Sequence, residues 1–310
     1  MTDTELSYAN MKQYSLSSKF ARSFFLSDQH THLEYPHDVG EEEQMLIKNT
    51  SSQIVCGRSG TGKTTVMLHR MCEIDAASRL EDEDNMPAPQ MLVTASLKLA
   101  DQIRETFREM ALAAGSRTFQ DLNGVTRLNE IEPQGYPLIL TYDRFLRMLD
   151  QTLSCPFMTP ECRSVVVDLR LFKDRYYDTM DQGAIRQHKI TAPSLFTEIM
   201  SVIKGSVDAI KMGGRRVLSR ETYVGLALAR KGSHLSAVER EVYYTFFEEY
   251  STRLGETPDH YDTADFVSHV YSALAAAPYR GMKMEYVYVD EVQDLSPAQI
   301  CIFRVSKYLR

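Results

Sequence analysis

The chain has 310 residues, of which 43% are hydrophobic and 25% are charged, and its formal net charge is −7. This composition is that of an ordinary globular protein, and the length allows one large α/β domain with an insertion, or two domains. The acidic balance excludes a uniformly basic nucleic-acid binder, so contact with phosphates would have to come from a local groove. No run approaches the roughly 20 apolar residues that a membrane helix needs.

The cysteines are odd in number and show no paired CxxC spacing. Free thiols in a reducing compartment are the simplest interpretation, and the first ten residues contain no apolar run of the kind found in a secretory signal. We therefore expect an intracellular protein of the nucleus or the cytoplasm. The cysteines are Cys56, Cys72, Cys155, Cys162 and Cys301.

Strands and helices are predicted to alternate through the first half of the chain. Residues 1–40 are polar and mixed, and the acids that follow favour a short helix over 41–47 because they interact with the helix dipole. Alternating strands and helices indicate a largely parallel sheet. The predicted strands are 53–56, 91–94 and 137–141, and the predicted helices are 63–77, 97–113 and one through 145–149.

The pattern changes after about residue 153, where helical periodicity dominates as far as about residue 280. A strand over 286–290 and a helix from Pro297 complete the chain. We therefore expect an α/β fold of the P-loop NTPase type with an inserted helical subdomain. The predicted organisation is a polar lead-in (1–40), the first part of the core (41–152), the helical insertion (153–280) and the second part of the core (281–310).

A glycine-rich phosphate loop follows the strand predicted over 53–56. Glycines let successive backbone N–H groups point inward around an anion, and the helix that begins at Lys63 adds the positive end of its dipole. The pattern predicts that Lys63 bridges the β- and γ-phosphates of a nucleoside triphosphate and that the Thr64 hydroxyl is a Mg²⁺ ligand. The loop residues are Gly57, Arg58, Ser59, Gly60, Thr61, Gly62, Lys63 and Thr64.

A second acidic segment, Asp290–Asp294, stands at the end of the apolar strand over 286–290. Ligands of parallel sheets bind at this end of the strands. The positions predict that Asp290 holds Mg²⁺ and that Glu291 orients and deprotonates an attacking water, as phosphoryl transfer requires. Acids here can also simply favour a helix start.

With both segments in hand, the chain resembles the N-terminal motor domain of UvrD/Rep-type superfamily 1 helicases. Residues 57–65, which end at Thr65, are similar to motif I, and Asp290–Asp294 is similar to the DExQD motif II. The resemblance implies an ATP- and Mg²⁺-dependent hydrolase in which Gln293 couples the nucleotide state to the nucleic-acid site. Together the motifs look closest to the eukaryotic TPR- and ankyrin-repeat helicase-like proteins, the lupus brain antigen group.

The resemblance also implies contacts with single-stranded DNA or RNA. Residues 93–100 are similar to motif Ia, residues 141–145 to motif Ib, and residues 261–267 to an acidic-aromatic segment that precedes motif II. A glutamine upstream of the loop often reads adenine in the family. Gln44 is near that position, while alignment on the apolar residues puts Glu43 in its place. The implied nucleic-acid contacts are Thr94, Ser96, Thr141 and Tyr142.

Motifs III to VI of the family and its second motor domain have no counterpart in the sequence, which ends shortly after Asp294. That domain normally supplies an arginine to the γ-phosphate, and a missing arginine lowers the rate on the order of 10³- to 10⁵-fold. In the family a strand after motif II fills the centre of the sheet, so we expect an incomplete sheet and a C-terminally truncated form of a longer protein.

Three hypotheses therefore remain from the sequence. The first is the first motor domain of a superfamily 1 helicase, with a second motor domain and single-stranded nucleic acid as partners and no membrane contact. The second is a nucleotide-dependent interaction or regulatory module that does not unwind nucleic acid. The third is an inactive fragment of a longer helicase-like protein.

Overall fold

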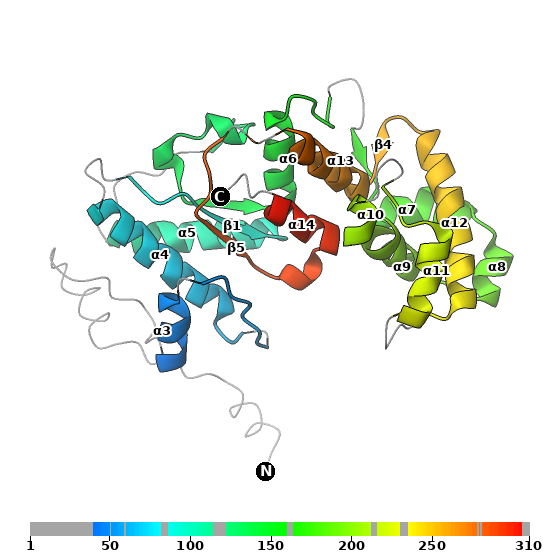
Figure 1. Cartoon of the computed structure of the whole chain (residues 1–310), viewed down its shortest axis with the longest axis horizontal. Coiled ribbons are helices and arrows are strands. Elements are labelled where there is room, and N and C mark those ends of the chain that lie inside the picture. The colour runs from blue at the N-terminus through cyan, green and yellow to red at the C-terminus, as the bar shows by residue number, and fades with distance from the viewer. Residues whose placement is uncertain are drawn as a thin grey trace, which may run out of the picture. The chain divides into compact units, whose positions relative to one another are not determined.

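The computed structural model describes residues 40–49, 51–58, 60–81, 86–113, 122–159, 164–211, 216–229, 235–277, 279 and 281–305. Its strands are β1 (Gln90–Thr94), β2 (Leu138–Thr141), β3 (Val165–Val166), β4 (His260–Tyr261) and β5 (Tyr286–Val289) (Figure 1). Its α-helices are α3 (Glu41–Lys48), α4 (Lys63–Glu81), α5 (Leu97–Ala113), α6 (Tyr142–Thr152), α7 (Leu169–Arg175), α8 (Gln182–Gln187), α9 (Ala192–Thr197), α10 (Val207–Lys211), α11 (Arg220–Ala229), α12 (Ala237–Gly255), α13 (Thr263–Ala276) and α14 (Pro297–Val305). Short 3-10 helices η1 (Leu128–Glu130), η2 (Pro133–Gly135), η3 (Tyr177–Thr179) and η5 (Val292–Asp294) and a π-helix η4 (Glu198–Ile203) connect them.

The chain divides into two compact units. The first comprises Met1–Gln90, Lys98–Asp121 and Pro133–Ile139, and the second comprises Met91–Leu97, Leu122–Glu132 and Leu140–Arg310. The phosphate loop therefore belongs to the first unit, and the acidic segment belongs to the second together with the mainly helical stretch. Within the described ranges, no helix has both the length and the apolar character that crossing a membrane requires.

The principal sheet has three strands in the order β2-β1-β5, so β5 lies beside a strand that precedes it by almost 200 residues (Figure 1). Every residue of β1 is buried, as expected for a strand covered on both faces. Beyond the end of β5, the Asp290 N–H donates to the carbonyl of Val93 at 2.9 Å. The fold is the expected α/β type with a parallel sheet, and most of the described residues are helical.

Two side chains tie the helices of the first unit to strand residues. The Gln90 amide donates to the Met71 carbonyl of α4 at 3.0 Å, and the Arg104 guanidinium of α5 donates to the Ile139 carbonyl at 2.8 Å. Both partners are backbone carbonyls, so each bond satisfies a group that burial would otherwise penalise. Helix α5 begins and ends at the residues that the apolar periodicity predicts.

Helices α7 to α12 gather into one group around a separate aromatic and aliphatic core (Figure 1). Beside them, β3 and β4 form a short parallel pair in which Val165 lies opposite His260. The division of the chain into an NTPase core and a helical insertion stays a prediction, since the compact units are divided differently. The central members of the core are Phe172, Leu195, Ile199, Ile203, Tyr223 and Tyr250.

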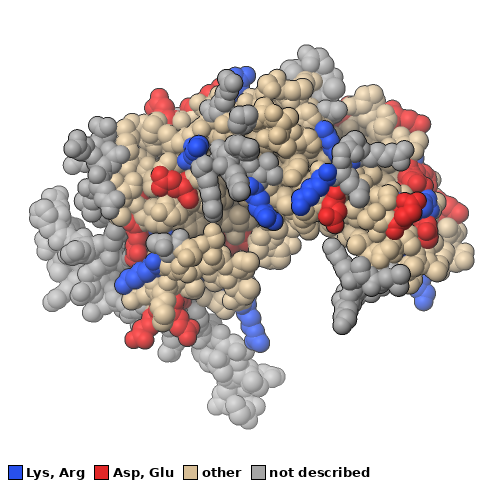
Figure 2. Space-filling view, in the orientation of Figure 1, with Lys and Arg blue, Asp and Glu red and all other residues tan. Residues whose placement is uncertain are grey.

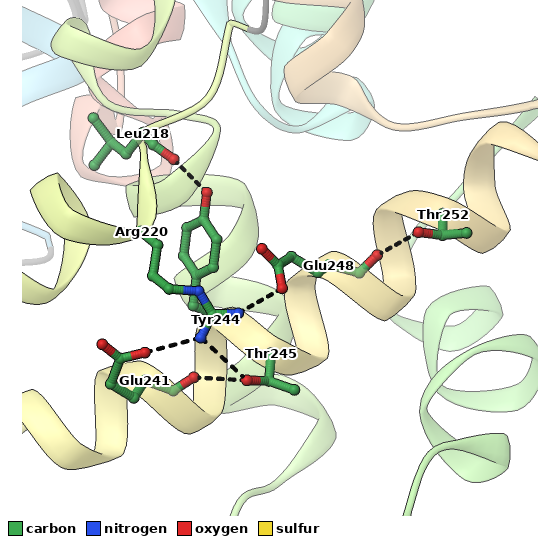
Figure 3. A network of polar contacts seen from close by, with 7 residues as sticks. All are labelled: Leu218, Arg220, Glu241, Tyr244, Thr245, Glu248 and Thr252. Carbon is green, nitrogen blue, oxygen red and sulfur yellow. Dashed lines mark hydrogen bonds and ion pairs between the residues drawn. The ribbon is translucent and has the colours of Figure 1, made fainter.

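Arg220, at the start of α11, fastens that helix to α12 (Figure 3). Its guanidinium donates to Glu241 at 2.9 Å and to Glu248 at 2.5 Å, and its Cζ atom lies 5.0 Å from the centroid of the Tyr244 ring. The Tyr244 hydroxyl donates to the Leu218 carbonyl at 2.8 Å. Arg220 therefore makes two ion pairs with α12 and a cation–π contact with the Tyr244 ring, and the hydroxyl of that ring is itself hydrogen-bonded.

The strand predicted over 53–56 does not form. These residues belong to no strand of the described chain, and the Ile54 side chain is 87% exposed. A β-rich run becomes a strand only where a neighbouring strand pairs with it. Here the side-chain amide of Gln53 donates to the Leu46 carbonyl of α3 at 2.8 Å.

Charged side chains of both signs are interspersed on the face that Figure 2 shows. Acidic and basic groups lie close to one another there. The face thus carries both kinds of charge, as the composition of the sequence suggests, with Asp and Glu outnumbering Lys and Arg in the whole chain.

Candidate active site

The phosphate loop owes its shape to glycines. Gly60 and Gly62 have φ values of 74° and 84°, in the left-handed region that side chains disfavour. Gly57 is required for a different reason, because a Cβ atom there would lie 2.7 Å from the Thr61 hydroxyl oxygen. The loop is exposed at Gly57, Arg58, Gly60 and Thr61, so it is accessible to a ligand, and Ser59 lies outside the described residues.

Lys63 and Thr61 close the loop through their side chains. The Lys63 ammonium donates to the carbonyls of Gly57 and Arg58 at 3.1 and 2.9 Å, and the Thr61 hydroxyl donates to the Arg58 carbonyl at 2.9 Å. Helix α4 begins at Lys63, and its first turn closes where Val66 N–H donates to the Gly62 carbonyl. The positive end of the helix, including half-buried Thr64 and Thr65, thus faces the loop.

Helix α3 places Glu43, rather than Gln44, beside the phosphate loop. A Cβ atom on Gly62 would lie 3.4 Å from Glu43 Oε1, while Glu43 Oε2 accepts a hydrogen bond from Gly40 N–H at 3.0 Å. Gln44 is exposed and lines an open hollow of about 450 Å³ on the surface of α3, together with Met45 and Lys48. The role of Gln44 in reading adenine stays a prediction.

The acidic segment begins with a buried carboxylate. Asp290 is 4% exposed, and its Oδ1 accepts a hydrogen bond from the Glu291 N–H at 3.0 Å. Glu291 itself adopts the left-handed conformation, with φ 51° and ψ 45°. For a residue other than glycine this conformation costs about 1 kcal/mol or more, and such strain is concentrated at functional sites. The turn thus places two successive carboxylates directly after the end of β5.

The residues after Glu291 hold its side chain. Gln293 lies in η5, and its amide donates to Glu291 Oε2. Ser296 then caps α14, because Ser296 Oγ accepts from Gln299 N–H at 3.3 Å and Gln299 Oε1 accepts from Ser296 N–H at 2.7 Å. This reciprocal cap marks the start of α14, shortly after the end of η5.

A family model described as the UvrD/REP helicase N-terminal domain matches residues 39–306 of this chain. The match spans both the phosphate loop and the acidic segment. The chain belongs to the UvrD/REP helicase family. Members of this family are ATP-dependent motors that use ATP with Mg²⁺ and act on nucleic acid, and this motor domain has the corresponding α/β fold.

The expected nucleic-acid contacts of this helicase domain differ in accessibility. Ser96 is exposed, whereas Thr94 is 2% exposed and its hydroxyl finds no hydrogen-bond partner among the described residues. Thr141 Oγ1 caps α6 by accepting from Arg144 N–H at 3.2 Å. Tyr142 is buried, and its hydroxyl donates to the Gln299 carbonyl at 3.2 Å. Of the four, Ser96 has the side chain best placed to meet a ligand.

This helicase domain offers Mg²⁺ a small number of oxygen ligands, which are the type that Mg²⁺ prefers. Among the described residues, no three His, Cys, Asp or Glu side chains gather as a metal cluster. Mg²⁺ bound with a nucleotide keeps several waters and takes only one or two protein oxygens besides the phosphates. A buried Asp290 carboxylate and the Thr64 hydroxyl at the start of α4 fit that demand in their chemistry.

Two site features were not anticipated from the sequence. The left-handed backbone of Glu291 has no sequence signal, because local preference at a glutamate favours negative φ. The cap at Ser296 does have a sequence signal. The run Ser296-Pro297-Ala298-Gln299 carries the serine and glutamine spacing of a capping box, with proline at the first helical position.

Proposed function

We propose that this domain binds Mg²⁺-ATP through its phosphate loop and hydrolyses it as the first motor domain of a UvrD-like DNA or RNA helicase. The observation that carries the proposal is the loop itself: two glycines with positive φ lead directly into a helix that begins with Lys63. The strained Glu291 beside buried Asp290 supports the hydrolytic half of the proposal.

The proposed chemistry is attack of water on the γ-phosphate. The loop residues Gly57 to Thr65 hold the phosphates, and Lys63 stabilises negative charge on the β- and γ-phosphates. Glu291 accepts the proton of the attacking water. Gln293, which donates to that carboxylate, fixes its orientation and couples it to the nucleic-acid site.

Thr64 and Asp290 are the residues we propose to hold Mg²⁺. When bound, the ion would neutralise negative charge on the phosphate oxygens. Burial of Asp290 suits this role, because a carboxylate in a shielded position attracts a cation more strongly than one in open water.

Two substitutions test binding and hydrolysis separately. Lys63→Ala should abolish the rise in melting temperature that Mg²⁺-ATP causes, which at about 100 times Kd corresponds to roughly 2.7 kcal/mol. Glu291→Gln should keep that rise while lowering the rate of hydrolysis by roughly 10²- to 10⁴-fold. Lys98→Ala and Glu285→Gln, which change exposed residues, are the matched controls. Normal hydrolysis by Glu291→Gln would contradict its assignment as the base.

A nucleotide-dependent interaction module is the second candidate. It is favoured by the burial of Thr94 and Tyr142, which leaves fewer side chains to grip nucleic acid. Single-stranded DNA and RNA should raise the ATPase rate of a motor at low salt, where phosphate contacts are strongest. Absence of stimulation in the presence of the second motor domain would favour the module.

The finer assignments follow the same proposal. The segments 57–65 and 289–294 support membership of the eukaryotic TPR- and ankyrin-repeat helicase-like group. The proposed partners are single-stranded nucleic acid and a second motor domain that supplies an arginine to the γ-phosphate, and the proposed location is the nucleus or the cytoplasm. Thr94, Ser96, Thr141 and Tyr142 stay the proposed nucleic-acid contacts.

A further inference from the structure

The helix that follows the acidic segment is held at its first turn by a distant part of the chain. The N–H of Ala298, the second residue of α14, donates to the Gly205 carbonyl at 2.8 Å. The first N–H groups of a helix have no partner within the helix, so an outside carbonyl fixes both its position and its direction. Ala298 is 1% exposed, and the bond is therefore shielded from water.

Gly205 lies in a tight turn between η4 and α10. A Cβ atom at this position would stand 2.0 Å from the Met200 carbonyl oxygen, so only glycine fits. Two bonds hold the residues that precede it: Lys204 N–H donates to the Ile199 carbonyl and Leu218 N–H donates to the Ile203 carbonyl, both at 2.9 Å. The turn that presents the Gly205 carbonyl is thus bound into the core formed by the helical stretch.

The side chain of Lys204 fastens this turn to α13. It is 6% exposed, and its ammonium lies 2.5 Å from Asp262 Oδ2 and 2.7 Å from Asp265 Oδ1. The Tyr250 hydroxyl also donates to Asp262 Oδ2, at 3.0 Å. Burial alone lowers the pKa of a lysine, but the two carboxylates outweigh it, and the pKa of Lys204 is raised. The ammonium therefore stays charged and paired.

The two carboxylates belong to the acidic-aromatic segment 261–267. Asp262 caps α13 by accepting from Asp265 N–H at 2.9 Å. Helix α13 in turn packs along α14. The acids of this segment therefore pair with Lys204 and cap α13. Two connections lead from them to α14: one through Lys204 and the Gly205 carbonyl, and one through the packing of α13 on α14.

We infer that Lys204 is a positioning residue for the acidic segment: its ion pairs with Asp262 and Asp265 fix the turn whose Gly205 carbonyl holds α14, and through α14 they set the position of Asp290 and Glu291. Lys204 touches none of the reacting groups. Its effect on hydrolysis rests on the proposed function, whereas its effect on the order of residues 286–305 does not.

Amide hydrogen exchange measured by mass spectrometry tests the structural half. In the full chain, Lys204→Met should raise the exchange rate of peptides covering 286–305 by roughly tenfold or more. Arg253→Met is the control, because Arg253 also lies in the helical stretch but donates to the carbonyls of Arg175 and Tyr176, at 3.0 and 3.3 Å, at the end of α7 rather than to η4. It should leave those peptides unchanged at a similar loss of melting temperature. Equal exchange of 286–305 in both variants would overturn the inference.

Kinetics tests the consequence for hydrolysis. Lys204→Met should lower kcat for Mg²⁺-ATP about tenfold or more. The Kd for nucleotide measured without Mg²⁺ should stay the same, because the phosphate loop belongs to the first unit whereas Lys204, Asp262 and Asp265 belong to the second. Should Lys204→Met fail to fold, Asp265→Asn keeps the Asp262 pair and should give a smaller change in the same direction. Unchanged exchange and kcat in a folded variant would overturn the inference. Absence of ATPase in the wild type would contradict the proposed function, and the exchange result would still decide the inference.

Discussion

At the scale of single residues, the loop and the acidic segment both depend on backbone conformations that most residues avoid. Gly60 and Gly62 meet this demand without strain, whereas Glu291 meets it with strain. The difference has a chemical reason, since a glycine at position 291 would carry no carboxylate. In the proposed hydrolysis, position 291 supplies an acidic side chain from this unfavourable conformation, and the hydrogen bond from Gln293 and the cap at Ser296 help to maintain it.

Gly57→Ala should weaken nucleotide binding. Its Cβ would stand 2.7 Å from Thr61 Oγ1, so Thr61 must rotate and give up its hydrogen bond to the Arg58 carbonyl. The loss of one oriented loop contact should lower ATP affinity roughly tenfold, as measured by titration calorimetry.

The partner substitution provides the control for this prediction. Thr61→Ala removes the obstructing hydroxyl, so adding Gly57→Ala to it should have a much smaller effect than Gly57→Ala alone. Gly255→Ala, at a position where a Cβ meets nothing within 4 Å, should leave affinity unchanged. Additive losses in the double variant would show that the clash is not the cause.

At the scale of elements, Arg220 makes a cluster of polar contacts between α11 and α12. Two partly exposed ion pairs and a cation–π contact together contribute about 1–2 kcal/mol. Arg220→Met should therefore lower the melting temperature by roughly 3–5 °C. The difference from wild type should shrink toward about 1 M salt, because screening weakens the two ion pairs in the wild type.

Arg170→Met, which changes an exposed arginine of α7, is the comparison for this measurement. It should stay within about 0.5 kcal/mol of the wild type at every salt concentration. A salt-independent loss in Arg220→Met would assign its effect to the packing of the side chain over Tyr244 rather than to charge.

Elements with a strong local pattern could be predicted from the sequence, and elements that depend on a distant partner could not. Helix α5 follows from its apolar spacing and β5 from its run of β-branched and aromatic residues. The run over 53–56 has the same β preference, yet the described chain provides no strand beside it. Thr94 is a proposed nucleic-acid contact, and the burial of its side chain in β1 could not be read from the local sequence. The Lys204–Asp262 pair joins residues 58 positions apart, and no local pattern indicates it.

At the scale of the whole molecule, buried tyrosines make stability sensitive to alkaline pH. Burial raises the pKa of Tyr136 to about 12, and it also raises the pKa of Tyr142, Tyr223 and Tyr250. An acid with a raised pKa keeps its proton in the folded state after the unfolded chain has lost it. The contribution to stability is therefore complete below about pH 10 and is lost as the pH rises beyond it.

Urea unfolding between pH 9 and pH 11 checks this expectation. Each of these tyrosines should contribute up to about 1.4 kcal/mol per pH unit to the fall in the free energy of unfolding. Tyr136→Phe should reduce the slope by one such contribution. It should also raise stability at neutral pH, because the Tyr136 hydroxyl is buried without a hydrogen-bond partner among the described residues. An unchanged slope would mean that Tyr136 ionises equally in both states.

The exposed run before the phosphate loop has a consequence for the protein in concentrated solution. Ile54 and the Cys56 thiol lie on the surface within a run of β-forming residues that pairs with no strand of the described chain. Two molecules can align such segments edge to edge, as exposed strands do. Oxidation of the two Cys56 thiols would then join the molecules by a disulfide next to the phosphate loop, so purification under reducing conditions protects the site.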